Sequence, residues 1–257
     1  MNMTDILVSP RQGSQGLRGG ANPPRVRFLA WLGRVLTVLA ALMTAWCTPL
    51  AGADTVTVCA GGECDYMTVQ AAIDAESTDA GDVISILDSV HTEAGIRVDK
   101  SVVIIGAGAS KTLVQAGGGP NVAVNRVFTV GSGASVTIRD MTIRYGKVVS
   151  HPGRGGGILN NGTLTLERST VTQNRAIGAD GSPGGTGSGG GIYNNGSMII
   201  LASTIRDNTA GGGDGSSGDA DGGDAHGGGI ASSENGSLVI LNSTISGNTA
   251  LHGAGYG

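Results

Sequence analysis

The sequence predicts an all-β protein, a parallel β-helix of three-strand coils with a short capping helix near its N-terminal end. Three observations predict this fold class. One phrase occurs four times in the second half of the chain, 47 of the 257 residues are glycine, and only 3% are aromatic. This composition excludes an ordinary globular core, while the regular return of Val, Ile and Leu excludes disorder. A repeat architecture satisfies both facts.

The four copies of the phrase begin at Gly133, Gly162, Gly196 and Gly236, and Gly-Gly-Gly-Ile precedes the last three of them. Apolar residues alternate with Thr, Ser or Ile at the start of each copy, which predicts a strand with one buried face. The expected inward side chains are Leu164 and Leu166 with their equivalents Val136, Ile138, Met198, Ile200, Leu238 and Ile240.

Two further strands complete the predicted coil. A second strand follows a two-residue corner and carries Ile143, Val171, Ile205 and Ile245 at equal positions, and a third carries Ile158, Ile192 and Ile230. Strands that recur in register at this short period predict a solenoid whose coils hydrogen-bond to one another about 4.8 Å apart.

Three asparagines recur at one position after the second strand. Asn174, Asn208 and Asn248 each lie five residues after the serine of a Ser-Thr-Val/Ile triplet. Asparagine tolerates the left-handed conformation of a tight corner, and stacked amides hydrogen-bond along the axis. We expect these three residues to occupy the corner as a structural ladder without a chemical role.

Glycine-rich segments separate that corner from the next Gly-Gly-Gly-Ile, at residues 176–188 and 210–226. Both leave the coil at the same corner, so we expect them to lie side by side on one edge. Asp180, Asp214, Asp219, Asp221, Asp224 and His226 are concentrated there. Oxygen ligands on a flexible backbone suit calcium. The favoured interpretation is nevertheless a flexible loop kept hydrated by its acidic residues.

The first 53 residues have the pattern of a secretory signal peptide with a long leading region. Arginines at 25, 27 and 34 precede an apolar run from 35 to 46, and Ala-Gly-Ala follows at 51–53. The run is shorter than the roughly 20 residues of a membrane span, so export is favoured over an anchor, and we expect no span in the exported part. That part keeps 11 basic and 19 acidic residues, a net charge of −8, which argues against a nucleic-acid partner.

Residues 54–130 are predicted to form the N-terminal cap and the first, irregular coils, and residues 131–257 the regular repeats. Residues 66–74 have a helical pattern with Thr68 as N-cap, suited to covering the exposed end of a solenoid. Cys59 and Cys64 are expected to form a disulfide in an oxidising compartment; the alternative, a metal site, offers only Glu63 and Asp65 as nearby ligands. The chain stops where another Gly-Gly-Gly-Ile is expected, which predicts a fragment of a longer protein.

These phrases resemble a known class of proteins. Residues 100–108, the Val-Thr-Ile-Arg-Asp-Met-Thr-Ile run from 136 and the Asn-Ser-Thr-Ile-Ser-Gly-Asn-Thr-Ala run from 242 are similar to right-handed parallel β-helices of the pectin-lyase-like superfamily. More closely they resemble bacterial secreted or surface proteins with polymorphic-outer-membrane-protein-type repeats. The resemblance implies an exported protein, secreted or at the cell surface or outer membrane.

Three functions are weighed for such a scaffold. A polysaccharide lyase or glycoside hydrolase would use outward charges such as Asp140, Arg144, Arg168, Arg206 and Asp207, yet these change identity from coil to coil and both tryptophans lie in the leader. A calcium-binding repeat protein would use the acidic loops. The favoured hypothesis is a non-catalytic surface or secreted protein for adhesion, without cofactor, whose partner is an extracellular polymer or a cell-surface protein.

Overall fold

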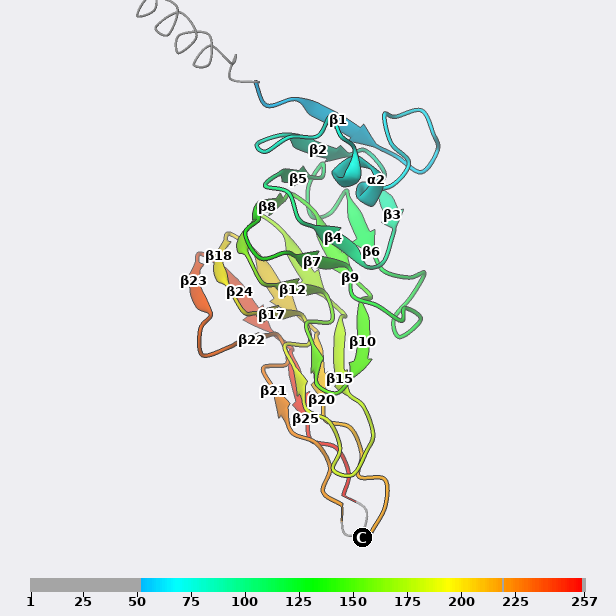
Figure 1. Cartoon of the computed structure of the whole chain (residues 1–257), viewed down its shortest axis with the longest axis vertical. Helices are drawn as coiled ribbons and strands as arrows, with labels where there is room; N and C mark the ends of the chain where they lie inside the picture. The colour runs from blue at the N-terminus through cyan, green and yellow to red at the C-terminus, as the bar shows by residue number, and fades with distance from the viewer. Residues whose placement is uncertain (1–51, 219, 256–257) are drawn as a thin grey trace, which may run out of the picture. The chain divides into compact units, whose positions relative to one another are not determined.

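The computed structural model describes residues 52–218 and 220–255, and these residues form five parallel sheets and one short helix. Figure 1 shows the strands stacked as successive coils. The predicted leader, residues 1–53, lies outside the described residues except for its last two positions.

Three of the sheets build the coils of a parallel β-helix. Each coil passes once through sheet A, sheet B and sheet C. Sheet A contains β1 (Thr55–Val58), β2 (Val83–Ile86), β5 (Val103–Ile105), β8 (Ser135–Arg139), β13 (Thr163–Glu167), β18 (Ser197–Leu201) and β23 (Ser237–Leu241). Sheet B contains β3 (Val90–Thr92), β6 (Leu113–Gln115), β9 (Thr142–Arg144), β14 (Thr170–Thr172), β19 (Thr204–Arg206) and β24 (Thr244–Ser246). Sheet C contains β4 (Ile96–Val98), β7 (Phe128–Val130), β12 (Ile158–Asn160), β17 (Ile192–Asn194) and β22 (Ile230–Ser232).

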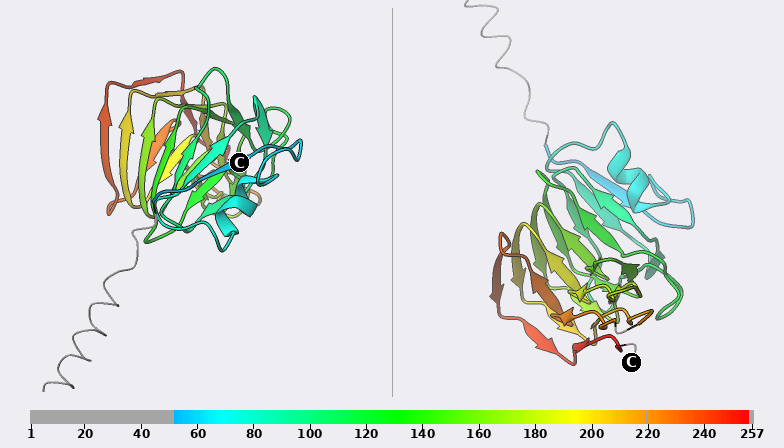
Figure 2. Two further views of the ribbon diagram at one scale, coloured as in Figure 1. Left: turned by 90° about the horizontal axis from the view of Figure 1, so that it is seen from above. Right: turned by 60° about the horizontal axis from the view of Figure 1, so that its bottom comes forward.

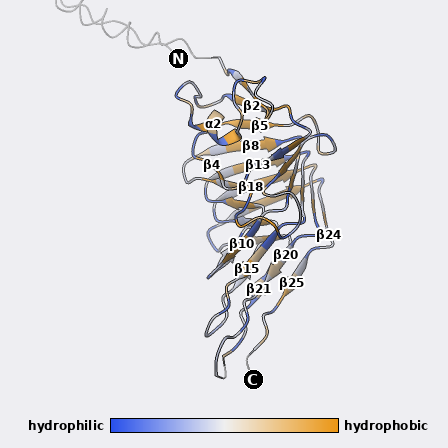
Figure 3. Cartoon of the chain, turned by 90° about the vertical axis from the view of Figure 1, so that its right-hand side faces the viewer, coloured by the Kyte–Doolittle hydropathy of each residue, from blue (hydrophilic) through white to orange (hydrophobic). Residues whose placement is uncertain are grey.

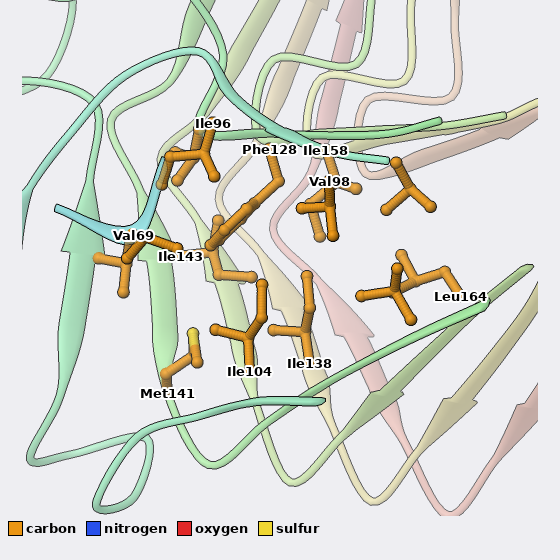
Figure 4. Close-up of a cluster of buried hydrophobic side chains, with 14 of the residues drawn as sticks. Val69, Ile96, Val98, Ile104, Phe128, Ile138, Met141, Ile143, Ile158 and Leu164 are labelled. Carbon is orange, nitrogen blue, oxygen red and sulfur yellow. The ribbon is translucent and has the colours of Figure 1, made fainter. Parts of the chain in front are cut away.

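The predicted inward residues form continuous aliphatic columns. Leu164 of β13 stands in register between Val136 and Met198, and Val171 of β14 stands between Ile143 and Ile205. All of these side chains are buried, as Figure 4 shows for the middle coils. The three-strand coil and its core are therefore confirmed.

The inward side chains of the last described coil are more exposed than those of the preceding coils. Ile240 and Ile245 are 38% and 49% exposed, because no further strand among the described residues pairs with β23 or β24. Their equivalents one coil below, Ile200 and Ile205, are fully buried.

The corner between sheets A and B depends on one residue per coil with a left-handed backbone. Asp140, Arg168, Ala202 and Asn242 have φ between 46° and 60° at equivalent positions. The following serines form a ladder: Ser203 Oγ accepts from the Ser169 N–H at 3.1 Å, and Ser243 Oγ accepts from the Ser203 N–H at 3.1 Å. Each corner is thus tied to the next one.

A short helix lies at the N-terminal end of the stack, as predicted. It is α2 (Val69–Asp74), and the Thr68 side chain accepts a hydrogen bond from the Ala71 N–H at 3.1 Å. The helix buries Val69, Ala72 and Ile73 and contacts β1, β2 and β4. These contacts cover the aliphatic columns where the first coils begin.

The described residues of the glycine-rich segments include short paired strands, so the prediction of a loop without regular structure is wrong for them. They form an arm of two further parallel sheets, which leaves the coils between sheets B and C (Figure 2). Sheet D holds the outgoing legs, β10 (Lys147–Ser150), β15 (Arg175–Gly178), β20 (Thr209–Gly211) and β25 (Thr249–Leu251). Sheet E holds the returning legs, β11 (Gly153–Arg154), β16 (Gly187–Ser188) and β21 (Ala225–His226). The side-by-side placement of the segments is as predicted.

Backbone packs directly against backbone in the outer part of the arm. Hydrogen bonds alternate between returning and outgoing legs: Gly185 donates to Ala179, Gly213 to Gly185, Gly223 to Gly213 and Gly253 to Gly223, at 2.7–2.9 Å. A Cβ atom on Gly213 would collide with the Ala179 carbonyl, and one on Gly223 with the Gly185 carbonyl. Glycine is required here by close approach.

Candidate functional site

A cleft lies where the arm meets the coils. Its volume is about 500 Å³. One wall comes from sheet E and the segments beside it, and the floor comes from the outer face of sheet C. Figure 3 shows the arm, with β10, β15, β20, β21 and β25 labelled, extending away from the coils. The cleft is lined by His151, Pro152, Arg154, Thr186, Ser188, Tyr193, His226, Ala231 and Ser232.

The lining residues are placed by the coil register. Arg154, Ser188 and His226 pair with one another across β11, β16 and β21, so they form one column along the wall. On the floor, Tyr193 pairs with Ala231 in the same way. Since successive parallel strands are about 4.8 Å apart, Arg154 and His226 lie roughly 10 Å from each other along the axis.

Arg154 and Tyr193 form the best-defined contact in the cleft. The guanidinium carbon lies 4.9 Å from the centre of the Tyr193 ring, which is a cation–π geometry. Arg154 is exposed, whereas Tyr193 is 8% exposed. The buried ring therefore supports the guanidinium from below while the donors on its edge remain open to a ligand.

The chemistry of the lining selects for negative charge. Its ionisable side chains are Arg154, His151, His226 and Tyr193, and no carboxylate is among the lining residues. Hydroxyl groups of Thr186, Ser188 and Ser232 supply further hydrogen-bonding partners. In a chain with net charge −4, this cleft gathers cationic and hydroxyl groups. It is suited to an anionic, hydroxyl-rich ligand.

The acidic arm residues proposed as calcium ligands serve the arm itself. Asp180 accepts a hydrogen bond from the Asp214 N–H at 2.8 Å, and Asp214 accepts one from the Ala254 N–H at 2.7 Å. Asp224 lies 3.2 Å from the Nε2 atom of His252. The carboxylates of Asp180, Asp214 and Asp224 thus each contact a residue of the next layer of the arm.

The structure does not assemble the predicted metal ligands. Asp219 lies outside the described residues. The main-chain carbonyl of Asp221 accepts a hydrogen bond from the Gly184 N–H at 3.0 Å, and His226 lines the cleft. Within residues 52–218 and 220–255, no group of three or more His, Cys, Asp or Glu side chains is arranged to hold a metal ion.

The asparagine ladder joins three coils. Asn174 Nδ2 donates to Asn208 Oδ1, and Asn208 Nδ2 donates to Asn248 Oδ1, both at 3.0 Å. Asn174 and Asn208 are fully buried. The expected backbone conformation is wrong: the left-handed residue is the preceding one, Gln173, Asp207 or Gly247 in successive coils, with φ between 55° and 63°.

A second ladder was not predicted from the sequence. Asn160 Nδ2 donates to Asn194 Oδ1 at 2.8 Å, and Asn194 Nδ2 donates to Ser232 Oγ at 3.1 Å. It follows sheet C at the corner that leads into sheet A, beside the floor of the cleft. The repeated Asn-Asn-Gly at 160–162 and 194–196 is the signal that could have revealed it.

The two cysteines of the N-terminal cap form a disulfide. The sulfur atoms of Cys59 and Cys64 are 2.06 Å apart and close a loop beside β1. Asp65 accepts hydrogen bonds from the hydroxyl and the N–H of Thr57, both at 2.7 Å, and these bonds lower the pKa of Asp65. The Asp65 carboxylate thus fastens the loop to β1.

The charges considered for a lyase are paired with one another. Arg168 holds both carboxylate oxygens of Asp140, at 2.7 and 2.8 Å, and this hydrogen bonding lowers the pKa of Asp140. Arg206 pairs with Asp207. Arg144 donates to Gln115 and stacks on Tyr145 at 4.5 Å. None of these residues is among those that line the cleft.

One buried histidine was missed in the sequence. His91 is 2% exposed and occupies the inward position of β3, in register with Val114 of β6. Its ring nitrogens lie 2.8 Å from Asp88 and 2.9 Å from Glu93. Burial opposes the charged imidazole, but the hydrogen bonds to Glu93 and Asp88 outweigh it and raise the pKa of His91.

The same network fastens the N-terminal cap. Glu93 accepts from the N–H groups of Val69 and Gln70 at 2.7 and 2.9 Å, in the first turn of α2. Burial raises the pKa of Glu93, but the bonds from His91 and from these backbone groups lower it overall. Asp88 accepts from the Ala60 N–H at 2.9 Å, inside the disulfide loop.

Two general findings complete the description. Within the described residues, no helix has both the length and the apolar character of a membrane span. Comparison of the chain with protein-family models, with curated proteins and with solved structures finds no match in any of the three.

Proposed function

We propose that this protein is a non-catalytic binding protein of the cell exterior, secreted or attached to the surface, that contacts an anionic polymer along the cleft beside its arm. The proposal combines the export pattern of the leader with an elongated repeat scaffold. The observation that carries it is the column of Arg154, Ser188 and His226 above Tyr193, which offers positive charge and hydroxyl groups to one ligand.

The geometry favours a polymer over a small molecule. The wall column continues through three arm layers, so its polar groups recur along the coil axis and not around one point. A ligand that follows this column needs a negative group opposite Arg154 and hydrogen-bonding groups such as hydroxyls opposite Ser188 and His226, which lies about 10 Å from Arg154. Acidic extracellular polysaccharides have this chemistry, and they are the partner class that we propose.

A lyase is the alternative that the same cleft supports. His151 or His226 would remove the proton beside a uronate carboxylate, and Arg154 would neutralise the carboxylate. A glycoside hydrolase is a poorer fit to this cleft, because such enzymes need a pair of carboxylic acids and the lining contains no Asp or Glu. Catalysis would therefore appear as elimination, with an unsaturated sugar end as product.

The test is binding of the purified protein to a panel of acidic and neutral polysaccharides, with unsaturated product followed on the same samples. We expect binding to acidic polymers that weakens as salt is added. Arg154→Ala should weaken it at least about tenfold, the effect of losing one charge-assisted hydrogen bond. Arg206→Ala removes an exposed arginine of sheet B, away from the cleft, and should leave binding unchanged.

The outcomes separate the candidate functions. Equal binding by wild type and Arg154→Ala would show that the cleft is not the contact site. Binding accompanied by unsaturated product would replace the proposal with a lyase. Binding without product, lost with Arg154→Ala and retained with Arg206→Ala, would support it.

A further inference from the structure

Three asparagines, two of them exposed and one half-buried, stand in one column at the corner between sheets C and A. Asn161, Asn195 and Asn235 each begin an Asn-Gly-Thr or Asn-Gly-Ser triplet, and the triplet's hydroxyl residue is the first residue of β13, β18 or β23. Thr163, Ser197 and Ser237 are in register across these strands. The triplet therefore recurs at the same place in three successive coils.

The buried ladder leaves these asparagines without a structural role. Asn160 and Asn194 point inward and form the ladder, and their Oδ1 atoms accept from the N–H groups of Gly162 and Gly196 at 3.2 and 3.3 Å. The bend is held by these contacts. The next asparagine in each pair points outward.

The outward amides are open to solvent. Asn195 and Asn235 are exposed and Asn161 is half-buried. Asn195 Nδ2 makes a long contact, 3.4 Å, with Asn161 Oδ1. The side chains of Ser197 and Ser237 are exposed as well. An enzyme could thus reach both the amide and the hydroxyl in the folded protein, and a group added to the amide would project into solvent.

We infer that this column is an N-glycosylation site. Asn-x-Ser/Thr, with x not proline, is the acceptor sequence for N-linked sugars in exported proteins. In the reaction, the Nδ2 atom of asparagine forms a bond to C1 of a sugar carried by a glycosyl diphosphate donor. The bond between C1 and the diphosphate breaks, the diphosphate leaves with the bonding electrons, and the transferase takes the proton lost from Nδ2.

The column lies at the rim of the cleft. Asn195 follows Tyr193 by two residues, so its backbone is about 7 Å further along the strand direction. The inference does not depend on which ligand the cleft binds, because it rests on the acceptor sequence and its exposure.

A fourth triplet provides a comparison. Asn242-Ser243-Thr244 has the acceptor sequence, but its counterparts in the two coils below begin with Arg168 and Ala202. It is not part of the column, and Asn242 sits at the left-handed corner between sheets A and B.

The first test is peptide mapping by mass spectrometry of the full-length protein isolated from the cells that export it. We expect glycan on Asn195 and Asn235 and a lower occupancy on the half-buried Asn161. Ser197→Ala should abolish the modification of Asn195 although Asn195 is retained, and Ser197→Thr, the matched control, should preserve it. Unmodified asparagine, or conversion to aspartate alone at these Asn-Gly pairs, would overturn the inference.

The second test measures the folded site directly. Protein made in a host without N-glycosylation is incubated, folded, with a soluble asparagine-specific glycosyltransferase and a nucleoside diphosphate hexose. Transfer to Asn195 in wild type and Ser197→Thr, and none in Ser197→Ala, is the expected result. Transfer that requires prior unfolding would show that the corner does not present the acceptor and would refute the proposed site.

Discussion

Replacing Asn208 by alanine tests how much the asparagine ladder contributes to the free energy of unfolding. The buried amide accepts from the N–H and from the Nδ2 of Asn174, and it donates to the carbonyls of Val171 and Arg206 and to Asn248 Oδ1. Alanine removes all five hydrogen bonds. The Asn174 N–H is left buried without its acceptor, at a cost of about 1–3 kcal/mol, and the two hydrogens of the lost amide, which three acceptors share, contribute about 1 kcal/mol each. We expect the free energy of unfolding to fall by about 4 kcal/mol.

The measurement is urea-induced unfolding followed by circular dichroism, with the slope against urea compared between variants. Asn195→Ala is the matched control, because Asn195 also recurs from coil to coil at a corner but is exposed. Its replacement should change the free energy of unfolding by no more than about 0.5 kcal/mol. A loss below about 1 kcal/mol for Asn208→Ala, at an unchanged slope, would refute the view that the ladder carries stability. Hydrogen exchange at the Asn174 N–H should accelerate in the variant.

Three other perturbations have defined outcomes. The pKa of His91 is raised in the folded protein, so the stability that it contributes is complete below about pH 6.5 and is lost as the pH rises through its folded-state pKa. The pKa of Glu93 is lowered, so the stability that it contributes is lost as the pH falls below about 4.3. Urea unfolding from about pH 2 to pH 9 should show both losses, and His91→Gln should remove the alkaline one; an unchanged alkaline limb would contradict the network. Gly213→Ala should destabilise the arm by about 3 kcal/mol through backbone collision, while Gly119→Ala, whose Cβ meets nothing nearer than 3.9 Å, should be close to neutral; equal effects would contradict the close packing. Replacing both cysteines of the disulfide by serine should cost about 2 kcal/mol from loop entropy, and thermal unfolding that does not change would count against it.

The coils could be predicted because their signals repeat. Leu164 and Leu166 alternate with polar residues at period two, and the same alternation returns in each coil, so one strand assignment supports the others. The helix at Val69–Asp74 carried its own start signal in Thr68. The ladder position of Asn208 could be predicted from the equal spacing of the asparagines. The backbone conformation of the corner could not, because the tolerance of asparagine for positive φ does not say which of two neighbouring residues adopts it.

The arm and the cleft could not be predicted in the same way. Glycine has no side chain whose periodicity indicates a strand, so the order in the arm becomes visible only when backbones meet in three dimensions. Arg154, Ser188 and His226 are different residue types, so the sequence did not indicate that they occupy the same position in successive coils. Each of them directly precedes a Gly-Gly-Gly, and this equal offset was the available signal. His91 lies in a coil that has no repeated counterpart.

The interleaved backbone of the arm constrains how such a chain can change during evolution. Each layer hydrogen-bonds to the layers on both sides: Gly213 donates to Gly185 of the layer before it, and Gly215 donates to Ala254 of the layer after it. Lengthening or deleting a single arm would strand the polar groups of both flanking layers, whereas duplicating a coil together with its arm reproduces every contact at the new junction. The heritable module is therefore the coil plus its arm, copied whole, while the residues at positions such as 154, 188 and 226, which line the cleft, differ from copy to copy.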